Sequence, residues 1–280
     1  RGLGYMPVKF GISFTHTILN QAGALVNIYT DGTVQVNHGG TEMGQGLHTK
    51  MLAVASLELG VPVKDIRVMH TATDKVPNTS ATAASSGSDL NGAALQAACV
   101  TLRTRLQEVA AAEWGLPATE APSITFREGE VSHAASGRRD AFRRIVDRAY
   151  WRQVSLSSTG YYRTPDIHYD RAAGRGRPFH YFAYGAAVVE VEVNGLTGEH
   201  RVLRADILHD VGNSLSPAID KGQVEGAFIQ GLGWLTCEEV VFDRKGRLLT
   251  HSPSTYKIPA VGEAPADFRV ELLQGAPQPG

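Results

Sequence analysis

The sequence predicts an α+β fold in which mixed sheets pack against helices, arranged as two related subdomains. Three observations lead to this prediction. Apolar residues alternate on both sides of Asp31-Gly32, as is typical of a β-hairpin. Apolar residues then recur at three- and four-residue spacing after Gly46, which indicates a helix. The same order, a hairpin followed by a helix containing glycine and glutamine, returns in the second half.

The other elements follow from local signals taken in order along the chain. Ser88 or Asp89 is a suitable N-cap for a long amphipathic helix, and Gly115-Leu-Pro ends it. Ser216-Pro217 likewise begins a helix with Pro at its first position. The remaining expected elements are a strand at 66–70, a loop at 78–88, a hairpin at 123–135, a helix at 140–150, a hairpin at 188–208 and a hairpin at 237–251.

These elements suggest the domain boundaries. Residues 1–154 are expected to form the first subdomain and residues 180–280 the second, which is incomplete at its C-terminus. Residues 155–179 mix Ser, Gly, Pro and basic residues without periodicity, and we interpret them as a long connecting surface loop.

Composition narrows the class of protein. The formal net charge of the 280 residues is −1, which argues against a general nucleic-acid or membrane surface. No apolar run is long enough to cross a bilayer. Cys99 and Cys237 lie in no CxxC spacing, so they suggest neither a disulfide scaffold nor a zinc or iron–sulfur site. A cytoplasmic protein is the expectation.

Three loops have the composition of ligand-binding loops. The first, 39–46, contains four glycines before a helix, so its backbone N–H groups and the Gln45 amide can hold a polar organic group. The second, 82–88, places small and hydroxyl-bearing residues before another helix, which suits phosphate. The third, 220–226, contains Gln223. Each has an ordinary alternative: a glycine turn, a capping loop and a helix–helix contact.

Candidates for proton chemistry are Glu42, Asp210 and Glu225. A carboxylate near a helix start also favours the helix dipole, Asp210 can end a strand in an Asx-turn, and Glu225 can lie on a solvated helix face. No serine lies in a Gly-x-Ser-x-Gly elbow, so a hydrolase is disfavoured.

Motifs in this order resemble the molybdenum-cofactor domain of the xanthine dehydrogenase and aldehyde oxidase family, and most closely its xanthine dehydrogenase branch in a bacterial form. The likeness covers nearly the whole chain. The motifs are Lys9-Phe-Gly-Ile-Ser-Phe-Thr15, Gly39-Gly-Thr-Glu-Met-Gly-Gln-Gly-Leu-His-Thr-Lys50, Val76-Pro-Asn-Thr-Ser80, Thr82-Ala-Ala-Ser85, Gly160-Tyr-Tyr-Arg-Thr-Pro165, Gly222-Gln-Val-Glu-Gly-Ala-Phe228 and Pro253-Ser-Thr-Tyr-Lys-Ile-Pro259.

The resemblance implies a molybdenum–molybdopterin cofactor held between the two subdomains, without a direct protein ligand to the metal. It implies that the cofactor is bound by Met43, Gly44, Gln45, Thr82, Ser85, Ser86, Gly87, Ser88 and Gln223. It also implies that a flat purine stacks on Phe14, with Thr15 beside it and Ala83 and Ala84 giving the ring room.

No catalytic residue is expected within this chain, because the resemblance puts the general base, a glutamate, beyond Gly280. Residues that orient the purine are expected upstream of Arg1. The resemblance further implies hydroxylation of hypoxanthine and xanthine to urate, with electrons passing to 2Fe-2S and FAD groups on other domains or subunits and then to NAD. The expected assembly is a hetero-oligomer. The alternatives are an aldehyde oxidase-type hydroxylase, a non-catalytic module that binds a nucleotide phosphate, and a packing domain without a ligand.

Overall fold

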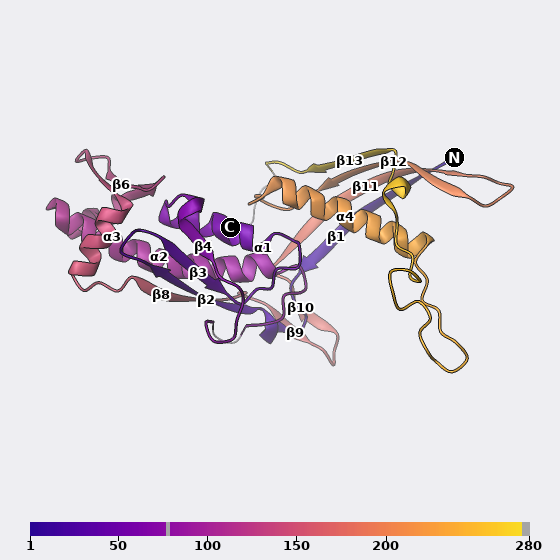
Figure 1. Ribbon diagram of the computed structural model, residues 1–280, viewed down its shortest axis with the longest axis horizontal. Coiled ribbons are helices and arrows are strands. Elements are labelled where there is room, and N and C mark those ends of the chain that lie inside the picture. The colour runs from indigo at the N-terminus through magenta and orange to yellow at the C-terminus, as the bar shows by residue number, and fades with distance from the viewer. Residues whose placement is uncertain (77–78, 276–280) are drawn as a thin grey trace. The chain divides into compact units, whose positions relative to one another are not determined.

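The computed structural model describes residues 1–76 and 79–275, and it confirms the α+β fold class (Figure 1). The chain divides into two compact units. Unit 1 comprises Arg1–Gly11 and Tyr181–Gly280, and unit 2 comprises Ile12–His180. The second segment of unit 1 begins at Tyr181, and the second subdomain was expected to begin at residue 180. The first eleven residues, expected in the first subdomain, belong instead to unit 1.

Unit 2 is built on a four-stranded sheet covered on one face by two helices (Figure 1). Its strands have the order β4-β3-β2-β8, in which β3 pairs antiparallel with β2 and parallel with β4. The elements of the sheet layer are β2 (Gln21–Ile28), β3 (Val34–His38), α1 (Leu47–Leu59), β4 (Ile66–Val68), α2 (Gly87–Trp114) and β8 (Ser157–Arg163).

Smaller elements complete unit 2. A three-stranded antiparallel sheet and a helix lie at the C-terminal end of α2, and a hairpin precedes the second segment of unit 1, which begins at Tyr181. They are β5 (Thr125–Arg127), β6 (Glu130–His133), β7 (Arg138–Ala141), α3 (Phe142–Trp151), β9 (His168–Asp170) and β10 (Arg175–Arg177), together with a 3-10 turn, η1 (Thr17–Leu19), before β2.

The expected connecting loop at 155–179 is wrong, because this segment contains β8, β9 and β10. No apolar run in the sequence indicates β8, because it is an edge strand with mixed burial. Gly160 explains how it packs: a Cβ there would overlap the Ala94 carbonyl oxygen of α2. The strand is therefore held by close backbone approach rather than by large apolar side chains.

Unit 1 repeats the strand arrangement of the sheet layer of unit 2, except that its outer strand β1 comes first in the chain whereas β8 comes last. Its strands have the order β1-β11-β12-β13, with β11 and β12 antiparallel and β12 and β13 parallel. One helix lies between the two parallel strands in sequence, as α1 does between β3 and β4. The elements are β1 (Gly2–Ile12), β11 (Tyr181–Val193), β12 (His200–His209), α4 (Pro217–Thr236) and β13 (Asp267–Leu272). The predicted internal repeat is confirmed at this level.

The expected hairpin at 237–251 is not formed by regular strands. Among the described residues of this segment, only an isolated bridge joins Phe242 to Leu248. Asp243 accounts for the turn instead, because its carboxylate accepts the backbone N–H groups of Lys245 and Arg247. Backbone hydrogen bonds also run from the Asp243 N–H to the Arg247 carbonyl oxygen and from the Leu249 N–H to the Val241 carbonyl oxygen, so the turn is confirmed but the pairing around it is short.

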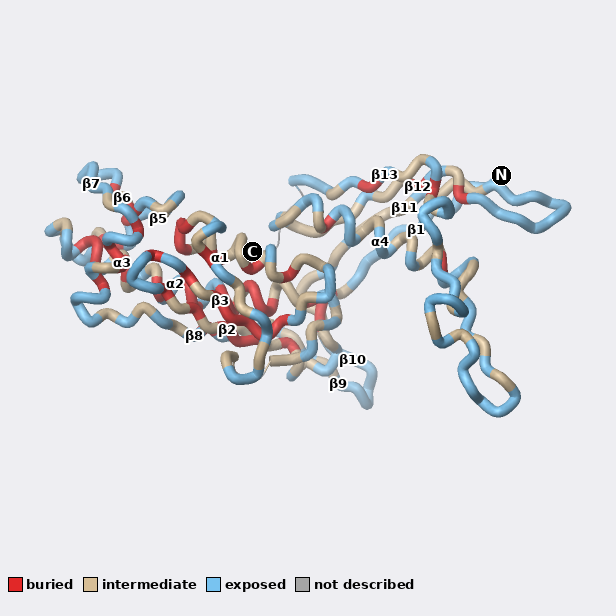
Figure 2. The backbone as a smooth tube through the Cα atoms, in the orientation of Figure 1, coloured by how far each residue is buried: buried red, intermediate tan, exposed pale blue. Residues whose placement is uncertain are grey.

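The hydrophobic core lies almost wholly in unit 2. All its clustered buried residues fall between Ala22 and Ala149, and Figure 2 shows them along the sheet and α2. Unit 1 buries few apolar side chains fully: Val202, Ala205 and Val270. There α4 packs on β13, with the Phe228 and Phe268 ring centroids 5.1 Å apart.

Candidate functional site

Four loops of unit 2 meet at one edge of its sheet. β3 and β4 are parallel, so the segments after them, beginning at 39 and 69, leave from the same edge. β2 runs antiparallel to both β3 and β8, so residues 13–20 enter and residue 164 leaves at that edge as well. α1 and α2 both begin there. The sheet topology therefore gathers the first two predicted ligand loops with the predicted aromatic clamp.

Glu42 accepts hydrogen bonds from the backbone N–H groups that the glycine loop was expected to offer to a ligand. Its carboxylate accepts the backbone N–H groups of Gly44, Gly46 and His48, each at 2.9 Å. Desolvation opposes ionisation of this carboxyl, but the three N–H groups outweigh it and hold its pKa below the ordinary value. Glu42 is thus an internal anion at the start of α1, and the general-base interpretation of Glu42 loses its support.

Gln45 is also engaged within the loop. Its Oε1 accepts the Met43 N–H at 2.6 Å, and its Nε2 donates to the Thr41 carbonyl oxygen at 2.9 Å. Both ends of the amide therefore brace the loop. Gly44 and Gly46 have φ of 100° and 77°, a conformation that favours glycine.

Two histidines that the sequence analysis did not identify, His38 and His48, support this loop. The Gly40 N–H donates to His38 Nδ1 at 3.1 Å, and His38 Nε2 lies 3.0 Å from His48 Nδ1. Since His38 Nδ1 accepts, its Nε2 carries the proton and donates to His48. Burial, and then the neighbouring His48, lowers the pKa of His38 to about 4, against a smaller opposite effect of Glu42. The sequence contains one signal for this role of His38: a histidine at the end of a buried strand.

The second loop presents an unusual backbone before α2. Ala84 and Ser85 both have positive φ, 55° and 56°, which non-glycine residues rarely adopt. Ser86 takes the N-cap position and its Oγ bonds the Ala83 carbonyl oxygen at 3.0 Å. The helix therefore starts at Gly87, slightly before the predicted Ser88 or Asp89. Within the described chain no hydrogen bond is recorded for the Gly87 or Ser88 N–H.

Direct contacts join the two loops. The Thr41 N–H donates to Thr82 Oγ1 at 2.8 Å. Gly39 lies against Thr79 so closely that a Cβ would overlap that side chain, and a Cβ on Gly40 would collide with Asn91 of α2. The structure thus brings together the predicted residues of the loops at 39–46 and 82–88. Pro77 and Asn78, part of a quoted motif, lie outside the described residues.

The predicted clamp residues lie on the turn that enters β2. Phe14 is half-buried and Thr15 is exposed. Ser80 Oγ donates to the Gln21 carbonyl oxygen at 3.3 Å, which ties the start of the second loop to the end of this turn. Ala83 is exposed and Ala84 half-buried. Phe14 and the small residues therefore belong to one connected edge of unit 2.

Gln223 belongs to the other unit, within α4 and exposed. By topology, α4 matches α1, so the segment before α4, 210–216, is the counterpart of the glycine loop. Gln223 follows the helix start and Gln45 precedes it, so the two glutamines are not equivalent in the repeat. Asp210 accepts the Gly212 N–H at 2.8 Å as an Asx-turn, and Glu225 pairs loosely with Lys221 at 3.9 Å.

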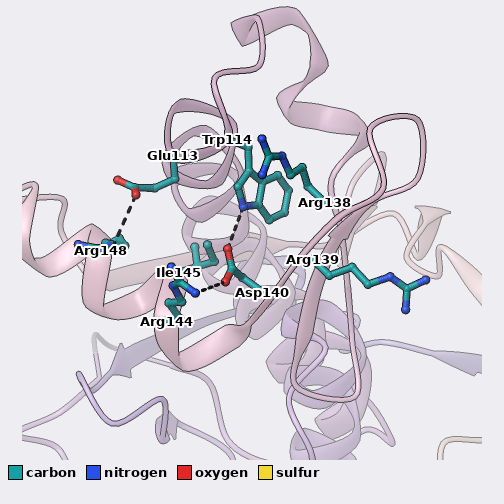
Figure 3. A pocket seen from close by; sticks show the side chains of 8 residues that line it. All are labelled: Glu113, Trp114, Arg138, Arg139, Asp140, Arg144, Ile145 and Arg148. Atoms are coloured by element: carbon teal, nitrogen blue, oxygen red, sulfur yellow. Dashed lines mark hydrogen bonds and ion pairs between the residues drawn. The ribbon is translucent and has the colours of Figure 1, made fainter.

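A polar pocket of about 240 Å³ lies at the opposite end of α2 and contains none of the predicted site residues (Figure 3). Hydrogen bonds and ion pairs between the residues that line this pocket account for it. Asp140 accepts from Trp114 Nε1 at 2.9 Å and pairs with Arg144 at 3.1 Å, while Glu113 lies 3.6 Å from Arg148. These pairs join the end of α2, β7 and α3 to one another, so the pocket is explained by packing.

Other kinds of site find little support in the described part of the chain. No group of three or more His, Cys, Asp or Glu side chains gathers there in a metal-binding arrangement. Both cysteines are free thiols, and burial raises the pKa of Cys99 to about 12. None of the described helices combines the length and apolar character needed to cross a membrane.

Comparison with known proteins agrees with the loop geometry. A family model described as "Molybdopterin cofactor-binding domain" matches residues 1–265. The chain is 51% identical over 277 residues to the xanthine dehydrogenase/oxidase of Felis catus and 47% identical over 282 residues to the xanthine dehydrogenase of Dictyostelium discoideum. It covers 99% and 100% of its own length in these matches, but it spans only 19% of either relative.

The fold is shared with a solved structure. Quinoline 2-oxidoreductase from Pseudomonas putida 86 superposes with a TM-score of 0.85 at 25% identity, over 99% of this chain and 35% of that one. The expected bacterial form is not supported by the curated relatives named above, which are eukaryotic. The chain belongs to the molybdopterin cofactor-binding domain family, as a homologue of the corresponding region of xanthine dehydrogenases.

Proposed function

We propose that this chain is the cofactor- and substrate-positioning portion of a molybdenum hydroxylase of the xanthine dehydrogenase type. The whole protein would hydroxylate hypoxanthine and xanthine to urate in the cytoplasm and pass electrons to 2Fe-2S, FAD and NAD elsewhere in a hetero-oligomer. The observation that carries the proposal is the junction of the loops 39–46 and 82–88 at one sheet edge, in a chain half identical to such enzymes.

The residues at this edge fit a molybdopterin. They offer neutral amides, hydroxyls and backbone N–H groups, and Glu42 already neutralises the start of α1. The anionic end of a pterin phosphate would therefore be held at the start of α2 by Ser85, Ser86, Gly87 and Ser88. Met43, Gly44, Gln45 and Thr82 would complete the cofactor contacts of unit 2. Gln223 of α4 stays a predicted cofactor contact of its own unit. When bound, the molybdenum centre supplies the redox and hydroxylation chemistry.

This chain's own residues bind and orient. Phe14 would offer an aromatic face to a planar purine, Thr15 a hydroxyl beside it, and Ala83 and Ala84 space for the ring. No catalytic acid or base is assigned within the chain, since Glu42 and Asp210 are engaged with backbone N–H groups. Its contribution to rate is preorganisation.

Cofactor retention tests the proposal. In the full-length protein, Thr82→Val removes the oxygen that accepts the Thr41 N–H and separates the two loops. We expect molybdenum and pterin content to fall several-fold. Thr101→Val is the matched control, because its Oγ1 bonds only the Ala97 carbonyl oxygen of its own helix. A wild-type protein purified without pterin, or equal pterin content in both variants, would refute the proposal.

The alternative within the family is a hydroxylase acting on another substrate class. Solved proteins with this fold include one named for quinoline and one named for aldehydes, so the fold leaves the substrate open. Turnover of xanthine, quinoline and an aliphatic aldehyde by the cofactor-loaded protein separates the classes. Preference for the aldehyde would replace the purine assignment.

A further inference from the structure

The side chain of Asn20 clasps the backbone of Phe14. Asn20 Oδ1 accepts the Phe14 N–H at 2.8 Å, and Asn20 Nδ2 donates to the Phe14 carbonyl oxygen at 2.9 Å. Fixing both the N–H and the C=O of one residue constrains its φ and ψ, and these set the direction in which its Cβ points. The clasp therefore aims the Phe14 side chain.

Asn20 is itself rigidly held. It is only 2% exposed, and its Nδ2 also donates to the Thr17 carbonyl oxygen at 3.2 Å. Its backbone N–H donates to that same oxygen, and its carbonyl oxygen accepts the N–H of Thr164, just after β8, at 3.0 Å. The side-chain donors and acceptor are all used within the Phe14 turn, and the backbone carbonyl oxygen of Asn20 connects this turn to the sheet edge.

Phe14 is not held by packing in the core of unit 2. Phe14 is half-buried, and it is neither in the core cluster of unit 2 nor among the partly buried residues that pack against it. Thr15 and His16, which follow it, are exposed. The Phe14 backbone is held by Asn20, and this fixes the position from which the ring extends.

We propose that Asn20 is a positioning residue that sets the Phe14 ring for stacking of a planar substrate. The inference rests on the proposed function for the role of Phe14, but the clasp itself does not. An amide is required at this position, because the group must accept one hydrogen bond and donate two. Aspartate has the same shape, yet it would place a charged oxygen against the carbonyl oxygens of Phe14 and Thr17.

Hydrogen exchange tests the clasp independently of turnover. In the full-length protein, Asn20→Leu removes the acceptor of the Phe14 amide, and we expect peptides covering 13–17 to exchange about tenfold faster or more. Asn27→Leu is the control, since Asn27 Nδ2 on β2 bonds only the Gln35 side chain, at 3.2 Å. Unchanged exchange in Asn20→Leu would overturn the clasp.

A double-mutant cycle tests the link to substrate. We expect Asn20→Asp to raise the dissociation constant of xanthine about three- to tenfold, the worth of one or two hydrogen bonds, with molybdenum content unchanged. In a Phe14→Ala background the same change should add nothing, because Asn20 acts through Phe14. Additive effects would overturn the positioning role. Absence of xanthine binding by the wild type would instead refute the proposed function and leave the exchange result standing.

Discussion

At the scale of single residues, buried hydrogen bonds decide which polar groups remain for a ligand. In the sequence Gln45 was a predicted cofactor contact and Glu42 a candidate for proton chemistry; in the structure both bond backbone groups of their own loop. Asn20 and His38 attracted no attention in sequence, yet both are buried and hold the loops in place. Residue type gives the hydrogen-bonding capacity of a group, but only the fold says which partners use it.

The His38 pair predicts a pH dependence of stability. Burial lowers the pKa of His38 from 6.5 to about 4, so the unfolded chain binds a proton more readily between these values. The contribution of His38 to the free energy of unfolding is therefore fully present above about pH 7. It falls by about 3 kcal/mol in total as the pH decreases toward 4. Urea midpoints measured from pH 7.5 to 4 should show this decline.

A non-titrating replacement isolates the effect. In His38→Asn, the amide oxygen can still accept the Gly40 N–H, but the side chain cannot be protonated, so the slope of stability against pH should flatten. His16→Asn, at an exposed position, should keep the wild-type slope. Equal slopes in all three proteins would show that His38 does not titrate as described.

At the scale of elements, strong periodicity predicted well and edge strands did not. α1, α2, α3 and α4 all appear where apolar spacing and caps predicted helices. β8 was missed because its pairing partner and the backbone of α2 hold it, and neither is visible in its own sequence. The expected hairpin at 237–251 is much shorter than predicted, because its pairing stops after one bridge beside the turn.

Substitution of Gly160 tests the packing of β8 on α2. A methyl group there would overlap backbone atoms of Ala94 and Ala98, which cannot move without bending the helix. We expect Gly160→Ala to lower the free energy of unfolding of unit 2 by about 3 kcal/mol or more. Chemical denaturation followed by circular dichroism measures this loss.

Gly92→Ala provides the matched control on α2. Its Cβ would lie 3.5 Å from the Met51 terminal carbon, an ordinary contact, and alanine is the better helix former. This variant should be as stable as the wild type or up to about 1 kcal/mol more stable. A Gly160→Ala protein as stable as Gly92→Ala would contradict the close packing of β8.

At the scale of the whole molecule, the chain is two units of matching topology and unequal cores. The continuous buried cluster belongs to unit 2, while few apolar residues of unit 1 are fully buried. Stability arises mainly from apolar area removed from water, so the two units should differ in autonomy.

We expect residues 12–180, expressed alone, to fold with a cooperative urea transition. Residues 1–11 joined by a short linker to residues 181–275, which keeps β1 in the sheet of unit 1, should show a weak transition or none, because this unit buries few apolar side chains. Circular dichroism and urea titration of the two fragments measure this difference. A non-cooperative 12–180 fragment would show that its core does not suffice.

The sequence by itself determined the α+β class, the helices, the internal repeat and the family. These depend on local periodicity, capping residues and motif order, all of which are written along the chain. Tertiary structure decided that the first two ligand loops and the Phe14 turn share one sheet edge, since parallel pairing of β3 with β4 carries their following segments to the same side. It also decided that Glu42 and Gln45 bond within their own loop and that Asn20 holds Phe14. The partners lie no more than six residues apart, but these hydrogen bonds form only in particular loop conformations, which residue type alone does not specify.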